Sequence, residues 1–156
     1  MARPLTDEQP LRLFAEQEHQ ALGRGLNDIH ELACAIGLEP SPQLSSDVSD
    51  VLIWIDRTLE PHIAWEDRWL YPEIERRTGT AWATRAAIFD HGQLRACADR
   101  LRRDRSTLPA NPHDARNVLR KDLYALETMV RAHLEREERL LLPVLDEPVL
   151  SSAVGR

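Results

Sequence analysis

The stretch His133-Leu-Glu-Arg-Glu137 places a histidine and a glutamate four residues apart. On a helix these two residues lie on one face, one turn above the other, so an imidazole nitrogen and a carboxylate can converge on one metal ion. The same pattern occurs at His62-Ile-Ala-Trp-Glu66. One copy is weak support because the spacing arises often by chance, but its repetition predicts a shared role for both.

Each copy belongs to a longer repeated unit. A proline stands ten positions after each of the two histidines, at Pro72 and Pro143. An earlier histidine that follows an acidic residue lies 43 residues upstream in the first copy and 42 in the second. Each unit therefore contributes two histidines and one glutamate. The six residues are His19, His62, Glu66, His91, His133 and Glu137.

Length and composition indicate one soluble domain. The chain has 156 residues, of which 42% are hydrophobic and 29% charged, typical of a globular protein with a sizeable core. No apolar run approaches the ~18 residues of a membrane span, and the N-terminus lacks the apolar core of a signal peptide. We therefore expect a cytoplasmic protein without a membrane partner. The net charge of −6 argues against a nucleic-acid partner.

The two cysteines, Cys34 and Cys97, predict neither a disulfide nor a metal pair. Their spacing fits no zinc pattern. In the bundle predicted below they lie ~13 Å apart along the axis, beyond the reach of a disulfide. We interpret both as reduced, structural residues.

Helical periodicity and capping signals predict four helices. The first covers residues 9–38, after the capping-box spacing of Thr6-Asp-Glu-Gln9, and a close neighbour would explain Gly23 and Gly25. Residues 39–46 form the first predicted loop. The remaining three helices are expected at 47–77, at 80–106 with Thr80 as its cap, and from Asn111 to about residue 144. These boundaries give one domain over residues 9–147 and a short tail over 148–156.

Further details follow from ideal helix geometry. Gly79 is predicted to end the second helix, and Pro61 to kink it before His62. Ideal periodicity places Trp69 and Leu140 on the faces that carry the histidines, and it places Tyr71 and Tyr124 opposite those faces. Core packing is the default interpretation for the tryptophans near His62, which are Trp54, Trp65 and Trp69.

Antiparallel packing of these helices would bring the six residues to one level. His19 lies ~18 residues before the first loop and His62 ~16 after it, so both lie ~24–27 Å from that turn. The heights of Glu66 and His91 relative to the next turn also match. We therefore predict an all-α, up-down-up-down antiparallel four-helix bundle with the six side chains meeting inside it.

This set of donors favours iron, manganese or zinc, and the lack of thiolates argues against a soft metal or a cluster. Two adjacent ions fit best if both glutamates bridge. Each ion would then receive two histidine nitrogens and one oxygen from each glutamate, and an oxo or hydroxo bridge would leave one open position per ion. Open positions beside a redox-active pair suit oxygen, nitric oxide or peroxide.

Four other polar residues are alternatives of lower rank. Asp67 and Glu138 follow the two glutamates and are the runner-up ligands, but ideal geometry directs them toward solvent. His30 lies ~16 Å up the axis from His19, which favours a packed or outer role. His113 is expected at the surface.

The sequence resembles the hemerythrin-like (HHE cation-binding) domains over roughly residues 11–147. The resemblance is carried by His19, His62-x-x-x-Glu66, His91 and His133-x-x-x-Glu137. It implies a four-helix bundle that holds a non-haem di-iron centre with Glu66 and Glu137 as bridges.

One departure from the oxygen-carrying members of that family bears on function. Those proteins have a His-x-x-x-His pair on the third helix and end with His-x-x-x-x-Asp, whereas here Arg95 stands four positions after His91 and Ala87 four positions before it. The missing histidine argues against simple reversible oxygen carriage. We expect a protein that binds or reduces a small oxidant, with an electron-donor protein as partner if it turns over. The alternative is a non-enzymatic sensor of iron or oxygen, or an iron-donating repair module, and the sequence leaves open whether the chain is an enzyme.

Overall fold

The computed structural model describes residues 11–37, 41–110 and 112–146, and this part of the chain is helical without any strand. It forms four long rods, of which the first is α1 (Leu11–Ala35) and the third is α5 (Arg85–Thr107). The second rod is continuous through α2 (Ser41–Trp54), η1 (Ile55–Leu59), α3 (Glu60–Trp65), η2 (Glu66–Leu70) and α4 (Tyr71–Thr78). The fourth runs through α6 (Pro112–Arg136), η3 (Glu137–Leu141) and η4 (Leu142–Asp146).

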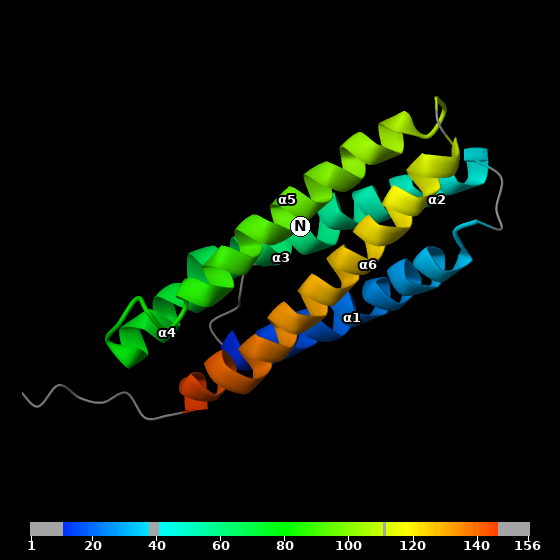
Figure 1. Ribbon diagram of the computed structural model, residues 1–156. Coiled ribbons are helices and arrows are strands. Elements are labelled where there is room, and N and C mark those ends of the chain that lie inside the picture. The colour runs from blue at the N-terminus through cyan, green and yellow to red at the C-terminus, as the bar shows by residue number, and fades with distance from the viewer. Residues whose placement is uncertain (1–10, 38–40, 111, 147–156) are drawn as a thin grey trace, which may run out of the picture.

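The rods pack side by side into an elongated bundle (Figure 1). α6 lies along both α1 and α5, while α2 contacts α1 and α5. α1 and α2 approach closely at Gly25, where an added Cβ would overlap the Trp54 indole. The prediction of a close neighbour is thus confirmed for Gly25, but Gly23 has open space around its Cα.

Three π-helical turns interrupt the α-helical rods, and a proline follows each one. In η1, η2 and η3 the amide that precedes the proline donates to the carbonyl five residues back, for example Tyr71 N–H to the Glu66 oxygen. Proline has no N–H and its ring clashes with the carbonyl four residues back. A π turn relieves both problems because it inserts one extra residue. The prolines are Pro61, Pro72 and Pro143.

The π turns correct the predicted helix faces. The extra residue rotates every following side chain, so Trp69 is 52% exposed and Leu140 is 65% exposed. Leu70 and Leu141, one position later, are buried instead. Trp65 is buried as predicted and Trp54 is half-buried.

Several helix boundaries also differ from the predictions. Residues 41–46 already belong to α2, so the predicted loop over them is wrong. α5 begins at Arg85 rather than beside Thr80, whose hydroxyl accepts a hydrogen bond from the Trp82 amide in a turn. Gly79 ends α4 in the left-handed conformation, with φ 71°, as predicted. α6 begins at Pro112 as predicted, while residue 111, residues 9–10 and the tail lie outside the described residues.

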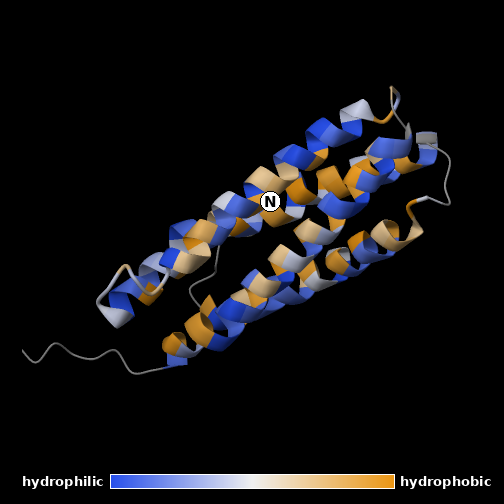
Figure 2. Cartoon of the chain, in the orientation of Figure 1, coloured by the Kyte–Doolittle hydropathy of each residue, from blue (hydrophilic) through white to orange (hydrophobic). Residues whose placement is uncertain are grey.

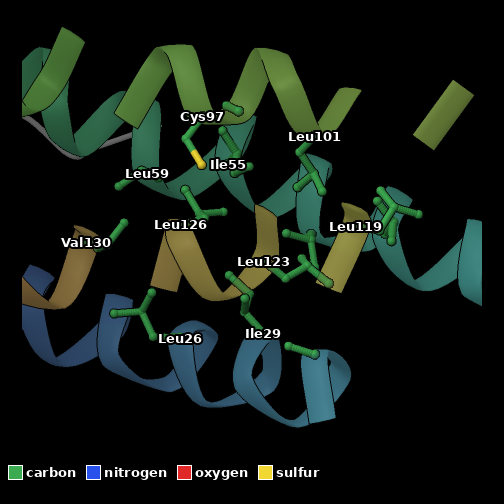
Figure 3. Packing of buried hydrophobic residues seen from close by; sticks show 14 of the residues in the cluster. Leu26, Ile29, Ile55, Leu59, Cys97, Leu101, Leu119, Leu123, Leu126 and Val130 are labelled. Carbon is green, nitrogen blue, oxygen red and sulfur yellow. The ribbon is translucent and has the colours of Figure 1, made fainter. Parts of the chain in front are cut away.

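Apolar side chains form two separate layers inside the bundle, and hydrophilic residues cover much of its outside (Figure 2). The larger layer fills the half of the bundle around Leu26, Leu59, Leu101 and Leu123 (Figure 3). The smaller layer lies around Phe14, Trp65, Tyr71 and Leu142. Between the two layers lies a belt of buried polar residues. Among the described helices, none is long and apolar enough to cross a membrane.

Candidate metal centre

The polar belt consists of the six predicted residues. The structure brings them together from all four rods, since α1, α3, η2, α5, α6 and η3 each supply one. All six are buried, and the most exposed of them, His19, is only 4% exposed. Buried carboxylates and imidazoles are costly unless they are paired or bind a metal, so this concentration in one layer needs a compensating partner.

One group of four residues surrounds the first candidate metal position. His19, His62, Glu66 and Glu137 each offer one ligand atom, and these atoms all lie within 4.8 Å of one another. His62 Nε2 lies 2.7 Å from Glu66 Oε1, and His19 Nε2 lies 3.3 Å from Glu137 Oε2.

A second group of four shares both glutamates with the first. Glu66, His91, His133 and Glu137 also offer ligand atoms within 4.8 Å of one another. Glu66 Oε1 faces the first pair of histidines, whereas its Oε2 lies 3.1 Å from His91 Nε2. Each oxygen of Glu66 thus faces a different pair of histidines, as a bridging carboxylate requires.

The donor atoms fit metal ions better than they fit one another. His62 Nε2, His19 Nε2 and Glu66 Oε1 are buried without a hydrogen-bond partner among the described residues, although they lie close together. His91 Nε2 and His133 Nε2 face each other at 3.2 Å. Buried donor atoms that gather without hydrogen bonds, as those of the first group do, are what a metal site needs, and imidazole with carboxylate suits iron, manganese or zinc.

The pKa shifts of the belt residues show how their charges influence one another. Burial lowers the pKa of His19, but the facing carboxylates of Glu137 and Glu66 outweigh it and raise the pKa to about 10. Burial raises the pKa of Glu66, yet the surrounding histidines outweigh it and hold the pKa well below its usual range. Burial and the neighbouring Glu66 raise the pKa of Glu137. A proton on His19 therefore helps to balance the carboxylates, and metal binding would release it.

Acidic residues face the outer nitrogens of three of the four histidines and hydrogen-bond to two of them, since His133 Nδ1 makes no hydrogen bond among the described residues. Asp67 Oδ1 lies 2.9 Å from His91 Nδ1, and Glu138 Oε1 lies 3.2 Å from His19 Nδ1. Asp90 Oδ2 lies 3.6 Å from His133 Nδ1. Asp67 and Glu138 are therefore not merely solvated, as the sequence suggested, since they orient ligands from outside. Such partners fix the imidazole ring and raise its basicity.

Tyr71 is the functional residue that ideal helix geometry missed. Its hydroxyl donates a short hydrogen bond to Glu137 Oε1 and lies 3.1 Å from His91 Nε2, and its ring stacks on His91. The prediction that Tyr71 lies opposite the ligand face is wrong because the π turn η2 returns the fifth residue after Glu66 to the same face. The proline at position 72 was the signal that could have revealed this turn.

The positions four residues before and four residues after His91 add no candidate ligand. Arg95 lies at the surface, where it pairs with Glu60 and Asp67. Ala87 is buried in the same apolar layer as Tyr71.

Together, the fold and the buried donors define a metal-binding helical bundle. The Hemerythrin HHE cation binding domain family matches residues 14–145, so the chain belongs to that family and the resemblance seen in the sequence is confirmed. Comparison with the curated proteins and with the solved structures gives no match.

Proposed function

We propose that this chain is a non-haem di-iron protein that binds or reduces a small oxidant in the bundle core. The observation that carries the proposal is the pair of overlapping ligand groups that share Glu66 and Glu137. One carboxylate shared between two pairs of histidines suits two adjacent ions, and a single ion would leave half of the donors without a partner.

The proposal assigns the residues as follows. His19 and His62 hold one ion, His91 and His133 hold the other, and both glutamates bridge. Two adjacent irons with open positions would bind oxygen, nitric oxide or peroxide and would transfer electrons to it. An electron-donor protein is the expected partner if the chain turns over.

Tyr71 would serve this function as a buried hydrogen-bond donor. Burial raises the pKa of Tyr71, and the carboxylates of Glu66 and Glu137 raise it further. The phenol therefore keeps its proton beside His91 and Glu137. A protonated hydroxyl in a water-poor layer can donate a hydrogen bond to a reduced oxidant and can hold Glu137 in place.

We also infer that the four rods alternate in direction, up-down-up-down. Support comes from the short connection at residues 79–84 and from the common level reached by side chains of all four rods. Short connections between neighbouring long helices favour antiparallel packing.

The test is an absorption spectrum of the iron-loaded chain. We expect two irons per chain and oxo-bridge charge-transfer bands that change when oxygen, nitric oxide or peroxide is added. His113→Ala is the matched control because His113 is exposed on α6 and should leave the bands unchanged. A spectrum that responds to none of the three oxidants would overturn the proposal.

A second candidate is a sensor or iron donor. It is favoured by His62, whose buried outer nitrogen Nδ1 has neither a hydrogen-bond partner nor, unlike that of His133, an acidic neighbour among the described residues. A ligand that lacks such support binds metal more weakly, so one ion would be releasable. Competition with a strong chelator at neutral pH separates the two functions, since an iron donor must lose iron readily and an oxidant-binding centre must keep both ions.

A further inference from the structure

A second cluster of reactive side chains lies away from the metal centre, across α1 and α6. Cys34 is exposed, and its sulfur lies 3.6 Å from His30 Nε2 and 3.2 Å from the Tyr124 hydroxyl. His30 Nδ1 lies 2.9 Å from Glu127 Oε2. The order sulfur, imidazole, carboxylate is that of an activated thiol, in which a base contacts the nucleophile and an acid orients the base.

The carboxylate of this cluster is held in place from its other side. Arg131 Nε donates a 2.9 Å hydrogen bond to Glu127 Oε1, and Arg131 also contacts the Asn27 amide oxygen at 2.8 Å. Burial raises the pKa of Glu127, but the hydrogen bonds from His30 and Arg131 outweigh it and lower the pKa overall. Glu127 therefore remains an anion that can stabilise a proton on His30.

Tyr124 completes the surroundings of the sulfur. Its hydrogen bond with Cys34 raises the pKa of Tyr124, so the phenol keeps its proton and can donate to a thiolate. Its ring also meets His30 edge to face at 5.9 Å. The other charged groups around the cluster are Glu31 on α1 and Arg120 and Arg131 on α6.

Room for a reactant lies beside the cluster. A hollow of about 340 Å³ lies between α1 and α6, and it is lined by His30, Glu127, Asn27, Glu31 and Arg131. Cys34 is exposed one helical turn after His30, outside this lining. The second cysteine of the chain, Cys97, cannot take part because it is fully buried in the larger apolar layer (Figure 3). Burial raises the pKa of the Cys97 thiol, which keeps it unreactive.

We propose that Cys34 is a redox-modification site, at which a hydroperoxide oxidises the thiol to a sulfenic acid and a low-molecular-weight thiol then forms a mixed disulfide. The site is independent of the metal centre and goes beyond the proposed function. Since the chain has only two cysteines and Cys97 is buried, the resolving thiol must come from a second molecule.

The two steps balance as follows. Cys34 gives its proton to His30, and the thiolate attacks one peroxide oxygen, so that an S–O bond forms and the O–O bond breaks. Sulfur loses two electrons, the peroxide gains them, and the leaving oxygen takes the proton from His30. The small thiol then attacks the sulfenic sulfur as its thiolate, an S–S bond forms, the S–O bond breaks and the oxygen leaves as water with the thiol proton.

Alkylation kinetics of the full chain with iodoacetamide test the activation by His30. At pH 6 an isolated thiol is almost wholly protonated, so a base in contact with the sulfur has its largest effect there, and we expect Cys34 in the native chain to react roughly tenfold faster than in His30→Asn. At pH 9.5 both thiols are ionised and the two rates should agree within about twofold. Glu127→Gln should resemble His30→Asn, whereas Glu31→Gln, in the same hollow, should resemble the native chain. Cys34→Ser gives the background from Cys97.

Peroxide treatment followed by mass spectrometry tests the two chemical steps. Metal-free chain exposed to hydrogen peroxide should carry a sulfenic acid at Cys34, trapped by dimedone, and should gain one glutathione when that thiol is added. His30→Asn should be modified more slowly at pH 6. Equal alkylation rates of the native chain and His30→Asn at pH 6 would overturn the proposal, as would modification that requires bound iron, since the oxidant would then come from the metal centre.

Discussion

The two halves of the metal centre have matching ligands but different surroundings. His19 and His62 come from the first repeat of the sequence, and His91 and His133 come from the second. Each half has one outer nitrogen hydrogen-bonded to an acid, His91 with Asp67 and His19 with Glu138. The halves differ in the other histidine, because Asp90 lies 3.6 Å from His133 Nδ1 without a hydrogen bond, whereas His62 Nδ1 has no acidic neighbour among the described residues. The repeat therefore encodes the ligands, and residues outside its motif make the halves unequal.

Equivalent positions in the two repeats show how this asymmetry arises. The residue before the glutamate is Trp65 in the first repeat, which stacks on His62, and Arg136 in the second, which pairs with Asp90. The residue five positions after the glutamate is Tyr71 in one repeat and Leu142 in the other. Each π turn buries that residue, so one half gains a phenol and the other an apolar contact. We expect the His91–His133 half to hold its ion more tightly.

Removing a shared ligand should have the largest effect on iron binding, because it weakens both halves at once. Glu137→Ala takes a bridging oxygen from both halves, so at most one weakly held iron per chain is expected. His91→Ala removes a ligand from one half only and should leave one iron. The measurement is iron stoichiometry together with helical content by circular dichroism. Two irons with unchanged oxo-bridge bands in Glu137→Ala would show that Glu137 is not a bridge, and Glu138 would be the next residue to test.

Chelator competition should separate the two halves. Iron should leave the native chain in two phases whose affinities differ by roughly tenfold or more, because outer partners strengthen histidine ligands by about that factor. In His62→Ala the weaker phase should vanish, and in His133→Ala the tighter one. A single phase in the native chain, with equal behaviour of the two variants, would show that the halves are equivalent.

Weakening the outer partner should make the halves more alike. Asp67→Asn removes the charge that faces His91 Nδ1, so iron affinity in that half should fall by about tenfold, within the 10–100-fold range for outer ligands. Glu135→Gln is the control, since Glu135 is exposed and pairs with Arg139 at the surface. Affinity measured by competition in Asp67→Asn should approach that of the weaker half. An unchanged affinity would mean that Asp67 contributes nothing to the asymmetry.

The sequence predicted which residues meet in this candidate centre better than it predicted their neighbours, for a physical reason. Ligand spacing within His62–Glu66 and His133–Glu137 is set by one ordinary helical turn, which periodicity describes well. The positions of Tyr71, Trp69 and Leu140 depend on π turns that begin at the two glutamates, and ideal periodicity contains no such turn. The prolines mark these turns in the sequence, but a proline also permits a kink or a helix end. Outer contacts such as Asp90 with His133 join different rods, so only the packed structure reveals them.

One buried carboxylate outside the centre has no histidine nearby among the described residues to lower its pKa, so the effect of burial on its pKa is not offset. Asp122 on α6 is 4% exposed, and burial together with Asp104 raises its pKa to about 6. The folded chain therefore binds more protons than the unfolded chain between about pH 4 and 6, so this group lowers the free energy of unfolding as pH rises through that window. Above pH 6 its contribution is constant.

Asp122→Asn should remove this pH dependence. In metal-free chain, the free energy of unfolding of the variant relative to the native chain should rise by about 2 kcal/mol between pH 4 and pH 7. Chemical denaturation at the two pH values measures it, and Asp99→Asn is the control because Asp99 is exposed and pairs with Arg102. A constant difference between variant and native chain across the window would contradict the raised pKa.

The smallest effect is expected from Tyr71→Phe, which removes the hydroxyl that distinguishes Tyr71 from Leu142. The ring stays buried against His91, and one hydrogen bond to Glu137 is lost, so the metal-free chain should lose about 0.5 kcal/mol of stability. Iron stoichiometry should stay at two, because the phenol is proposed as a hydrogen-bond donor and not as a ligand. The control is Tyr124→Phe, which makes the same change outside the centre. Loss of one iron in Tyr71→Phe would show that the phenol oxygen itself binds metal, and the halves would then differ in their ligands and not only in their surroundings.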